Sequence, residues 1–320
     1  MRGRLLVASV ALIALCVVAQ VAAAETWAQK LGWGPDDRVL IIHSDDVGMS
    51  YATVQGAIAA YENGVVSSMS IMMPCPWVGA MAAYVKEHPE TDAGLHLAMT
   101  SEWDYYRWGP VAGKSAVPGL ADEWGCLWDN VPLVLQHATP DEIEIEIRAQ
   151  IDRALAFGIK PTHMDSHMGT LFASPAYFER YMKVGIEKGI PILAVDLDPE
   201  RLAEERPELA GKLHDACLKV WDAGLPVIDD LVPAEYGMAP EKKKDDYIRL
   251  LRNLKPGISE MIVHCAKDTE TFRNITHAAP RWIADGDVML DPDIKRVIEE
   301  EGIILTNWRE LKARRDAVGK

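Results

Sequence analysis

Residues 38–50 read RVLIIHSDDVGMS, an apolar run that ends abruptly in polar side chains. The run from Val39 to Ile42 is short and aliphatic, which is typical of a buried strand. The adjacent acids Asp45 and Asp46 follow where that strand should end. Because neighbouring carboxylates repel each other in a partly desolvated place, the pair indicates chemistry that needs both.

Similar short runs recur along the chain, with helical segments between them. The predicted strands are 38–43, 66–72, 92–98, 161–165, 191–196, 225–229, 259–264 and 302–306. Unbroken alternation of strand and helix is typical of a parallel sheet with helices outside it. We therefore expect an α/β fold in which seven or eight parallel strands form one (β/α) barrel over residues 25–320, with an open sheet as the alternative.

Two of the intervening helices have clear end signals. Thr139 is a predicted N-cap, Pro140 a first helical residue and Gly158 the end of that helix. Its predicted buried stripe is Ile143, Ile147, Ile151 and Leu155. A second helix is expected from Ser174 to Gly189.

The N-terminus has the layout of a secretory signal peptide. Arg2 and Arg4 precede an apolar stretch from Leu5 to Val18, and small residues follow at 22–24. The stretch is too short for a comfortable membrane span, and an uncleaved anchor is the alternative. We expect residues 1–24 to be removed, leaving an exported periplasmic or extracellular protein without stable membrane insertion.

The charge balance limits the partners. With 33 basic and 48 acidic residues, the chain has a formal net charge of −15. Nucleic acid and anionic membrane surfaces would repel such a protein, so neither is an expected partner.

The cysteines outside the predicted signal peptide are few. They are Cys75, Cys126, Cys217 and Cys265. An oxidising compartment would allow two disulfides, with free buried thiols as the alternative. Either way, the fold does not depend on a disulfide scaffold.

Four histidines stand at three other predicted strand ends. His96 lies in or just after the strand at 92–98, and His264 ends the strand at 259–264. His163, Asp165 and His167 occupy alternate positions, so in extended chain all three point the same way. Since the carboxyl ends of parallel strands gather at one face, these side chains should meet the acid pair there.

A divalent metal fits this group of side chains. One carboxylate and two imidazoles, with the remaining positions open, form a common catalytic ligand set. The charge of the ion would offset the repulsion between Asp45 and Asp46, so that one can bind it while the other acts as general base. Spacing alone does not choose between His163 and His167. The alternative for the acid pair is a turn that caps a helix opening near Gly48.

Four motifs resemble, in order and spacing, those of the YdjC/ChbG-like carbohydrate deacetylases. They are HSDDVGMS at 43–50, GLHLAMT at 94–100, PTHMDSH at 161–167 and VH at 263–264. The resemblance covers most of residues 37–310. It implies an irregular (β/α) barrel related to polysaccharide deacetylases, and hydrolysis of acetyl groups on N-acetylated sugars or oligosaccharides.

The resemblance also implies roles. Asp45 resembles the catalytic base, and His264 stands where the family places a histidine near the leaving group. The implied ligands of one divalent ion, Mg or Zn, are Asp46, His96 and His167. His163 and Asp165 then become residues that orient those ligands.

Aromatic residues are dense in the long segment between His96 and residue 141. Flat rings suit the apolar faces of pyranose sugars, and Trp and Tyr also offer a polar edge. The predicted substrate-binding residues are Trp103, Tyr106, Trp108 and, in a loop after His264, Trp282. The alternative is that these rings only anchor a long loop.

We therefore expect an exported, metal-dependent deacetylase acting on an acetylated mono- or oligosaccharide. Two other functions stay open. One is a metal-independent glycoside hydrolase that uses Asp45 and Asp165 as its carboxylate pair. The other is a barrel that binds glycan without turnover.

Overall fold

The structure is a computed structural model that describes residues 25–103, 105–197, 211–232 and 238–319. The predicted signal peptide at 1–24 lies outside these ranges. Seven parallel strands form one sheet: β1 Arg38–Val47, β2 Ser68–Ile71, β3 Ala93–Leu97, β4 Met164–Ser166, β5 Asp230–Val232, β6 Gly257–Val263 and β7 Ile304–Leu305. Their order is β4-β3-β2-β1-β6-β5, and β7 pairs with the first half of β1.

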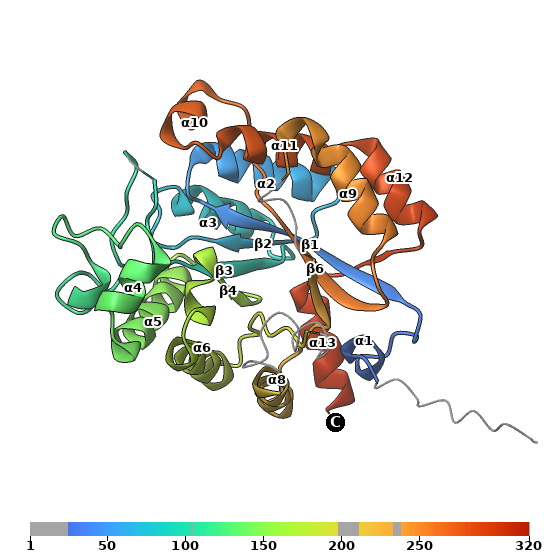
Figure 1. Ribbon diagram of the computed structural model, residues 1–320, viewed down its shortest axis with the longest axis horizontal. Coiled ribbons are helices and arrows are strands. Elements are labelled where there is room, and N and C mark those ends of the chain that lie inside the picture. Colours follow the sequence, from blue (N-terminus) through green and yellow to red (C-terminus); the bar gives the residue numbers. More distant parts are fainter. Residues whose placement is uncertain (1–24, 104, 198–210, 233–237, 320) are drawn as a thin grey trace, which may run out of the picture.

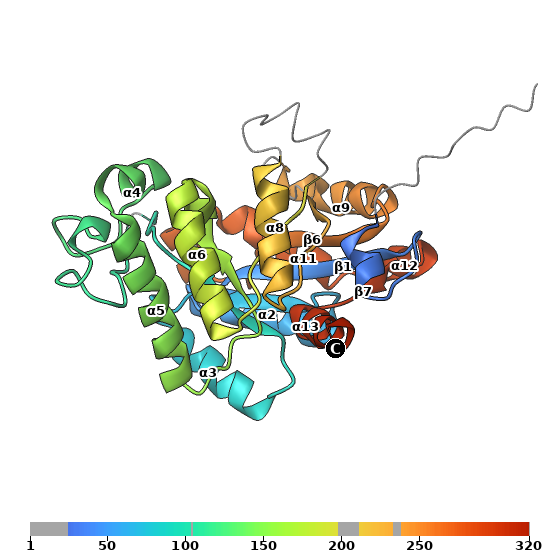
Figure 2. The same ribbon diagram turned by 90° about the horizontal axis from the view of Figure 1, so that it is seen from below.

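Helices cover the outside of this sheet (Figure 1). The α-helices are α1 Trp27–Lys30, α2 Tyr51–Asn63, α3 Val78–Glu87, α4 Val131–His137, α5 Pro140–Ala156, α6 Pro175–Lys188, α8 Lys212–Asp222, α9 Lys243–Arg252, α10 Glu270–Ile275, α11 Ala279–Met289, α12 Pro292–Glu300 and α13 Trp308–Val318. The 3₁₀ helices are η1 Pro118–Leu120, η2 His167–Phe172 and η3 Pro240–Lys242. Helices α5, α6 and α8 lie side by side along one flank (Figure 2). None of the helices in the described ranges is long and apolar enough to cross a membrane.

The parallel strands curl into a half-barrel, which confirms the expected irregular (β/α) architecture. Beyond β4 the pairing continues only as single bridges, from Met164 to Ile192 and from Val195 to Ile228. The strand predicted at 191–196 is therefore wrong as a regular strand. The strand predicted at 225–229 is displaced, because β5 begins at Asp230. Pro191 and Pro226 contribute to both differences, since proline cannot donate to a ladder.

The alternation of side chains along β1 divides the core. Val39 and Ile41 belong to the larger apolar cluster, whereas Leu40 and Ile42 pack with residues of α9 and α12. Because side chains alternate along a strand, His43 continues the face of Ile41. Side chains alternate in the same way along the neighbouring strand β6, so Glu260 points towards His43.

Helix α5 confirms most of its predicted signals. The Thr139 side chain accepts from the Glu142 backbone N–H, and Glu142 returns the contact, which completes a capping box. The buried stripe differs at its end, since Leu155 is exposed and Ala154 is buried in its place. The buried face of α5 has therefore shifted by one residue at the C-terminal end of the helix.

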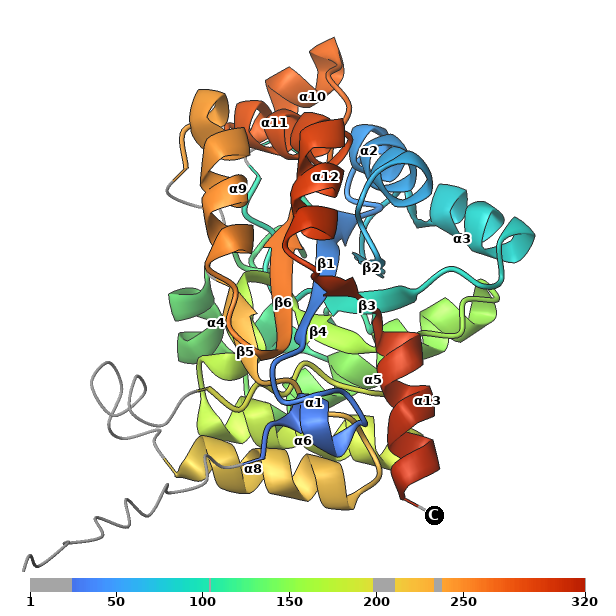
Figure 3. The ribbon, with the colours of Figure 1, turned by 90° about the vertical axis from the view of Figure 1, so that its right-hand side faces the viewer.

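The two ends of the described chain lie together. Helix α1 lies beside α13 (Figure 3), and Arg314 donates to the Leu31 carbonyl while its guanidinium covers the Trp33 ring. In the described residues Cys75, Cys126 and Cys217 are free thiols.

Candidate active site

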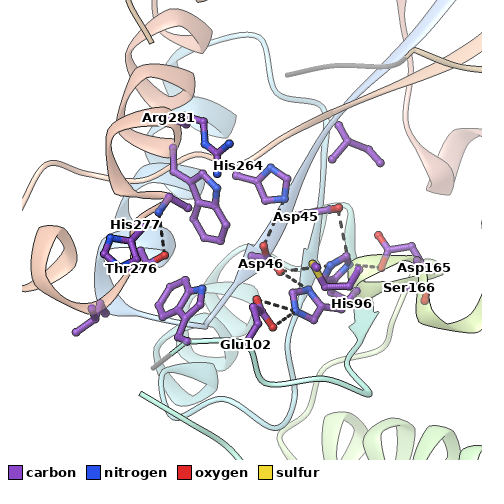
Figure 4. A pocket seen from close by; sticks show the side chains of 18 of the residues that line it. Asp45, Asp46, His96, Glu102, Asp165, Ser166, His264, Thr276, His277 and Arg281 are labelled. Carbon is purple, nitrogen blue, oxygen red and sulfur yellow. Dashed lines mark hydrogen bonds and ion pairs between the residues drawn. The ribbon is translucent and has the colours of Figure 1, made fainter. Parts of the chain in front are cut away.

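The carboxyl ends of several strands open into a cavity of about 690 Å³. Figure 4 shows acids and histidines converging on its floor. The predicted residues that line it are Asp45 and Asp46 of β1, His96 of β3, Asp165 of β4, His167 of η2 and His264 just after β6. Each of these side chains is almost fully buried.

Both acids of the pair reach this cavity because β1 is irregular there. The pairing of β1 with β2 shifts register between Ser44 and Val47. Within the shift, Asp46 has a φ of 61°, in the left-handed region. Aspartate tolerates this region better than most residues. The irregularity turns Asp46 towards the face that Asp45 already occupies, where a regular strand would separate them.

Asp46, His96 and His167 form a compact donor group, with one donor atom of each within 4.8 Å of the others. Asp46 Oδ1 lies 3.0 Å from His167 Nδ1 and 3.3 Å from His96 Nε2. This oxygen is buried and has no hydrogen-bond partner among the described residues. Because an unsatisfied buried carboxylate oxygen is costly, an Asp/His/His set of this kind suits a divalent cation.

The charge of Asp46 is set by its neighbours. Burial alone would raise the pKa of this carboxyl, but the imidazoles of His167 and His96 lower it to about 2. The oxygen that faces both rings is therefore ionised at neutral pH, as a metal ligand must be.

Asp165 holds two of the histidines. Its Oδ1 lies 2.6 Å from His96 Nδ1, and its Oδ2 lies 2.9 Å from His43 Nε2. Although burial opposes ionisation, both rings lower the pKa of Asp165. The contact leaves the other nitrogen of His96 directed at Asp46, so Asp165 holds the orientation of that ring.

His43 joins this network although the sequence reasoning did not select it. Its Nε2 lies 3.0 Å from Asp45 Oδ1, and its Nδ1 lies 2.9 Å from Ser68 Oγ. The signal was its position two residues before Asp45, on the same face of the strand. His43 therefore links Asp45 to Asp165.

His163 lies deeper than the other predicted residues. Its ring meets the His43 ring edge-on at 4.9 Å and stacks on Trp308 at 5.3 Å. Burial lowers the pKa of this imidazole, so it is neutral. Gly94 makes room for it, because a Cβ there would come within 2.4 Å of the ring. His163 supports His43, and the donor group contains His167 instead.

His264 lies near the other carboxylate oxygen of Asp46, Oδ2. Its Nε2 lies 3.4 Å from Asp46 Oδ2, and its ring stacks on Trp282 at 4.8 Å. The backbone N–H of His264 donates to the buried carboxylate of Asp285. Lys243 Nζ binds that same carboxylate at 2.5 Å, which fixes it behind the histidine.

Glu102 is a site residue that the sequence reasoning missed. It lies in the loop after β3, and both of its carboxylate oxygens approach His167 Nε2, at 3.1 and 3.0 Å. Burial opposes protonation of His167, but Glu102 and Asp46 together raise the pKa of its imidazole. No local pattern marked Glu102, because the loop conformation alone brings it to His167.

The predicted aromatic residues divide into two groups. Trp103 and Trp282 line the cavity, with ring centroids 5.6 Å apart. Tyr106 and Trp108 contact Trp103 but are not among the lining residues. The Trp108 indole donates to the Thr100 carbonyl, which makes it an anchor of the loop.

Other lining residues were not predicted from the sequence. Five polar ones come from α10, α11 and the turn between them, and they are Arg273, Asn274, Thr276, His277 and Arg281. These charged and polar residues belong to no recognisable sequence motif. Only the packing of α10 and α11 against the strand ends brings them to the opening.

The comparisons with known proteins agree with the motifs. The family model described as YdjC-like protein matches residues 39–300. The chain belongs to the YdjC-like family. This range includes every motif on which the resemblance was based and every acid and histidine of the cavity floor.

The curated relatives of this YdjC-like protein are named deacetylases. A carbohydrate deacetylase of Thermus thermophilus is 31% identical over 290 residues, covering 89% of this chain and 97% of the relative. One of Thermoanaerobacter pseudethanolicus is 27% identical over 276 residues, covering 86% and 100%. A chitooligosaccharide deacetylase of Serratia marcescens is 28% identical over 284 residues, covering 86% and 100%.

A solved structure supports the fold. An Enterococcus faecalis V583 protein, named for cellobiose-phosphate cleavage, superimposes with a TM-score of 0.70 at 22% identity. The match covers 86% of this YdjC-like chain and 99% of that one. At this identity the likeness concerns the α/β architecture.

Proposed function

We propose that this protein is a metal-dependent deacetylase that removes acetyl groups from N-acetylated sugars or oligosaccharides. The observation that carries the proposal is the buried Asp46–His96–His167 group at the floor of a substrate-sized cavity. The names of the curated relatives support the reaction class.

Asp46, His96 and His167 would hold one divalent ion, Mg or Zn. When bound, such an ion supplies Lewis-acid stabilisation to an acetyl carbonyl and to the water that attacks it. The protein contributes an ionised carboxylate and two oriented rings. Asp165 and Glu102 occupy the far nitrogens of those rings, which directs the near nitrogens at Asp46.

Asp45 is the proposed general base. It lies on the cavity floor beside Asp46, and its Oδ1 is held by His43 Nε2 at 3.0 Å and by the Ser70 hydroxyl at 3.2 Å. These contacts fix the carboxylate without placing it in the donor group of Asp46. It can therefore accept a proton from a water in the cavity during attack on the acetyl carbon.

His264 is the proposed proton donor to the departing amine. Its ring is clamped by the Trp282 stack and by the Asp285 contact to its own backbone. With Nε2 turned towards Asp46, it can protonate a leaving nitrogen in the cavity. Acetate and a free amino sugar would be the products.

Trp103 and Trp282 are the proposed sugar-binding surface. Both rings line the cavity and lie at an angle of 54° to each other. A tilted pair of indoles offers one flat face to a pyranose ring and a second wall beside it. This arrangement would bring an acetamido group to the acids and histidines on the floor.

The geometry favours this function over a glycoside hydrolase. A hydrolase would need Asp45 and Asp165 on opposite sides of a bond, free to act on it. In the structure Asp165 has each oxygen bound to an imidazole, and His43 contacts both acids. Asp165 is thus occupied in orienting rings.

We also propose that the protein acts outside the cytoplasm. The basic residues, apolar stretch and small residues of positions 1–24 support export of a single domain comprising residues 25–320. N-terminal sequencing of the protein from the periplasm or medium of its native host would test it. A chain that starts at Met1 in the cytosolic fraction would contradict it.

An acetate-release assay tests the central proposal. A panel of N- and O-acetylated glycans is incubated with purified protein whose metal content is measured on the same sample. We expect acetate from N-acetylated sugars, its loss on chelation and its return with added Zn²⁺ or Mg²⁺. Release of reducing sugar without acetate would indicate a glycoside hydrolase. Binding of glycan without either product would indicate a non-catalytic barrel.

A further inference from the structure

The two histidines of the donor group face Asp46 with different nitrogens. His96 presents Nε2 to Asp46 Oδ1, and its Nδ1 is bound by Asp165. His167 presents Nδ1 instead, at 3.0 Å, and its Nε2 is bound by Glu102. Each ring therefore stands between Asp46 and a second carboxylate.

This arrangement determines which nitrogen of each ring can bind a cation. A neutral imidazole has one N–H, which donates, and one lone pair, which can bind a metal. An ionised carboxylate can only accept, so its contact favours a proton on the nitrogen it touches. Both nitrogens of His167 touch a carboxylate. A cation bound by Asp46 would therefore take the place of the proton on Nδ1, while Glu102 would keep the proton on Nε2.

We propose that Glu102 is a positioning residue that fixes the tautomer and the orientation of His167 for metal binding. The inference rests on the metal site of the proposed function and adds a residue to it. Asp165 performs the same task for His96 from a strand. Glu102 performs it from a loop.

Glu102 is a positioning residue rather than a fourth ligand. The donor groups of the described residues whose atoms lie within 4.8 Å of one another do not include it. The His167 ring separates it from Asp46, because the two carboxylates contact opposite nitrogens of that ring.

The loop position of Glu102 connects the metal ligand to the sugar-binding surface. The next residue, Trp103, lines the same cavity and packs near Trp282. A shift of this loop would move the indole and the carboxylate together. The orientation of His167 is thereby linked to the wall on which a sugar would rest.

The test compares metal affinity among matched variants. Metal-stripped wild type, Glu102→Ala, Glu102→Gln and the control Glu123→Ala are titrated with Co²⁺ alone by calorimetry. The tautomer of His167 is read from ¹⁵N chemical shifts of the same proteins loaded with diamagnetic Zn²⁺. Glu123 is exposed and lies in the same long segment, so its change removes the same charge. The melting temperature of each metal-free variant reports on folding.

We expect Glu102→Ala to bind Co²⁺ about 10- to 100-fold more weakly and to lose the single Nε2–H tautomer. Glu102→Gln should recover most of the affinity, because its amide oxygen still accepts the Nε2–H bond. Glu123→Ala should match wild type. A folded Glu102→Ala protein with unchanged affinity and tautomer would overturn the proposal. Equal losses in Glu102→Ala and Glu102→Gln would overturn it too, because charge alone would then explain them. A wild-type protein that binds no Co²⁺ would overturn the metal site itself, a separate failure.

Discussion

His43 Nε2 lies 3.0 Å from Oδ1 of Asp45. The neighbouring acid, Asp46, faces the imidazoles of His96 and His167 at 3.3 and 3.0 Å. His96 also lies 3.8 Å from Asp45 through its other nitrogen, so the two adjacent carboxylates differ in their nearest partners. Their substitutions should therefore fail in different ways.

Asp45→Asn should keep the metal and lose the chemistry. The amide has the shape of the carboxylate but cannot take a proton, so turnover should fall by about 10²–10⁴. Metal content should stay near that of wild type, and added metal should not restore activity. Asp46→Asn weakens a charged ligand, so occupancy and activity should fall together and recover in part with added metal.

Elemental analysis and steady-state rates on the same samples separate these outcomes. Loss of metal in Asp45→Asn with retention in Asp46→Asn would exchange the two roles. Ser50 caps α2, so the acid pair is not a helix cap. If neither substitution changed acetate release, the pair would have no part in the reaction.

Removal of either ligand histidine should empty the site. His96→Ala and His167→Ala each delete one of three donors, so most of the bound ion should be lost. His88→Ala is the matched control, because this half-exposed histidine lies outside the cavity. Retention of stoichiometric metal in both ligand variants would contradict the proposed site.

Trp103 and Trp108 should respond differently to truncation. Trp103→Ala removes a cavity wall and should weaken sugar binding by about 1–3 kcal/mol, seen as a raised KM. Trp108→Ala removes a buried loop anchor and should cost about 3–5 kcal/mol of stability with little change in KM. Kinetics and chemical denaturation of both variants check this, and a larger KM effect from Trp108→Ala would reverse the assignment.

Glu260 should make stability depend on pH. Burial raises the pKa of this carboxyl from 4.5 to about 7. Between these values the folded protein binds the proton more strongly than the unfolded chain, so the contribution of Glu260 is present at low pH and is lost as pH rises through about 7. The difference is of the order of 3 kcal/mol.

Glu260→Gln should therefore stabilise the protein at pH 8 relative to wild type, and much less at pH 5. Its amide oxygen can still accept from the Trp308 indole, which the carboxylate binds at 2.8 Å. Urea unfolding at both pH values measures this difference. An equal effect at the two pH values would show that ionisation of Glu260 is not the cause.

Lys243 and Lys244 are adjacent in the sequence but differ in burial. Their substitutions therefore test how burial changes the contribution of an ion pair to stability. Lys243 Nζ binds Asp285 with both side chains fully buried, so Lys243→Met removes a cation from contact with a buried carboxylate. The expected cost is about 3–5 kcal/mol. Lys244 pairs with Asp291 in solvent, so Lys244→Met should change unfolding little. Equal effects of the two substitutions would contradict the importance of burial here.

The sequence by itself determined the elements whose information is local. The aliphatic run before His43 marks β1, because a strand buried on both faces appears in the sequence as a short continuous apolar run. Thr139 and Pro140 mark the start of α5 for the same reason, since a cap acts within one turn. The four motifs also indicated which acids and histidines meet, because parallel strands bring their carboxyl ends to one face.

Only the tertiary structure decided how those side chains are used. The left-handed φ of Asp46 depends on the irregular pairing of β1 with β2, and no local rule predicts it. Glu102 reaches His167 across 65 positions of sequence through a loop without periodicity. Trp103 lines the cavity while Trp108 anchors the loop behind it, although both are tryptophans in one segment. Residue type and spacing carry no information about such long-range packing, which depends on the whole set of contacts formed when the chain folds.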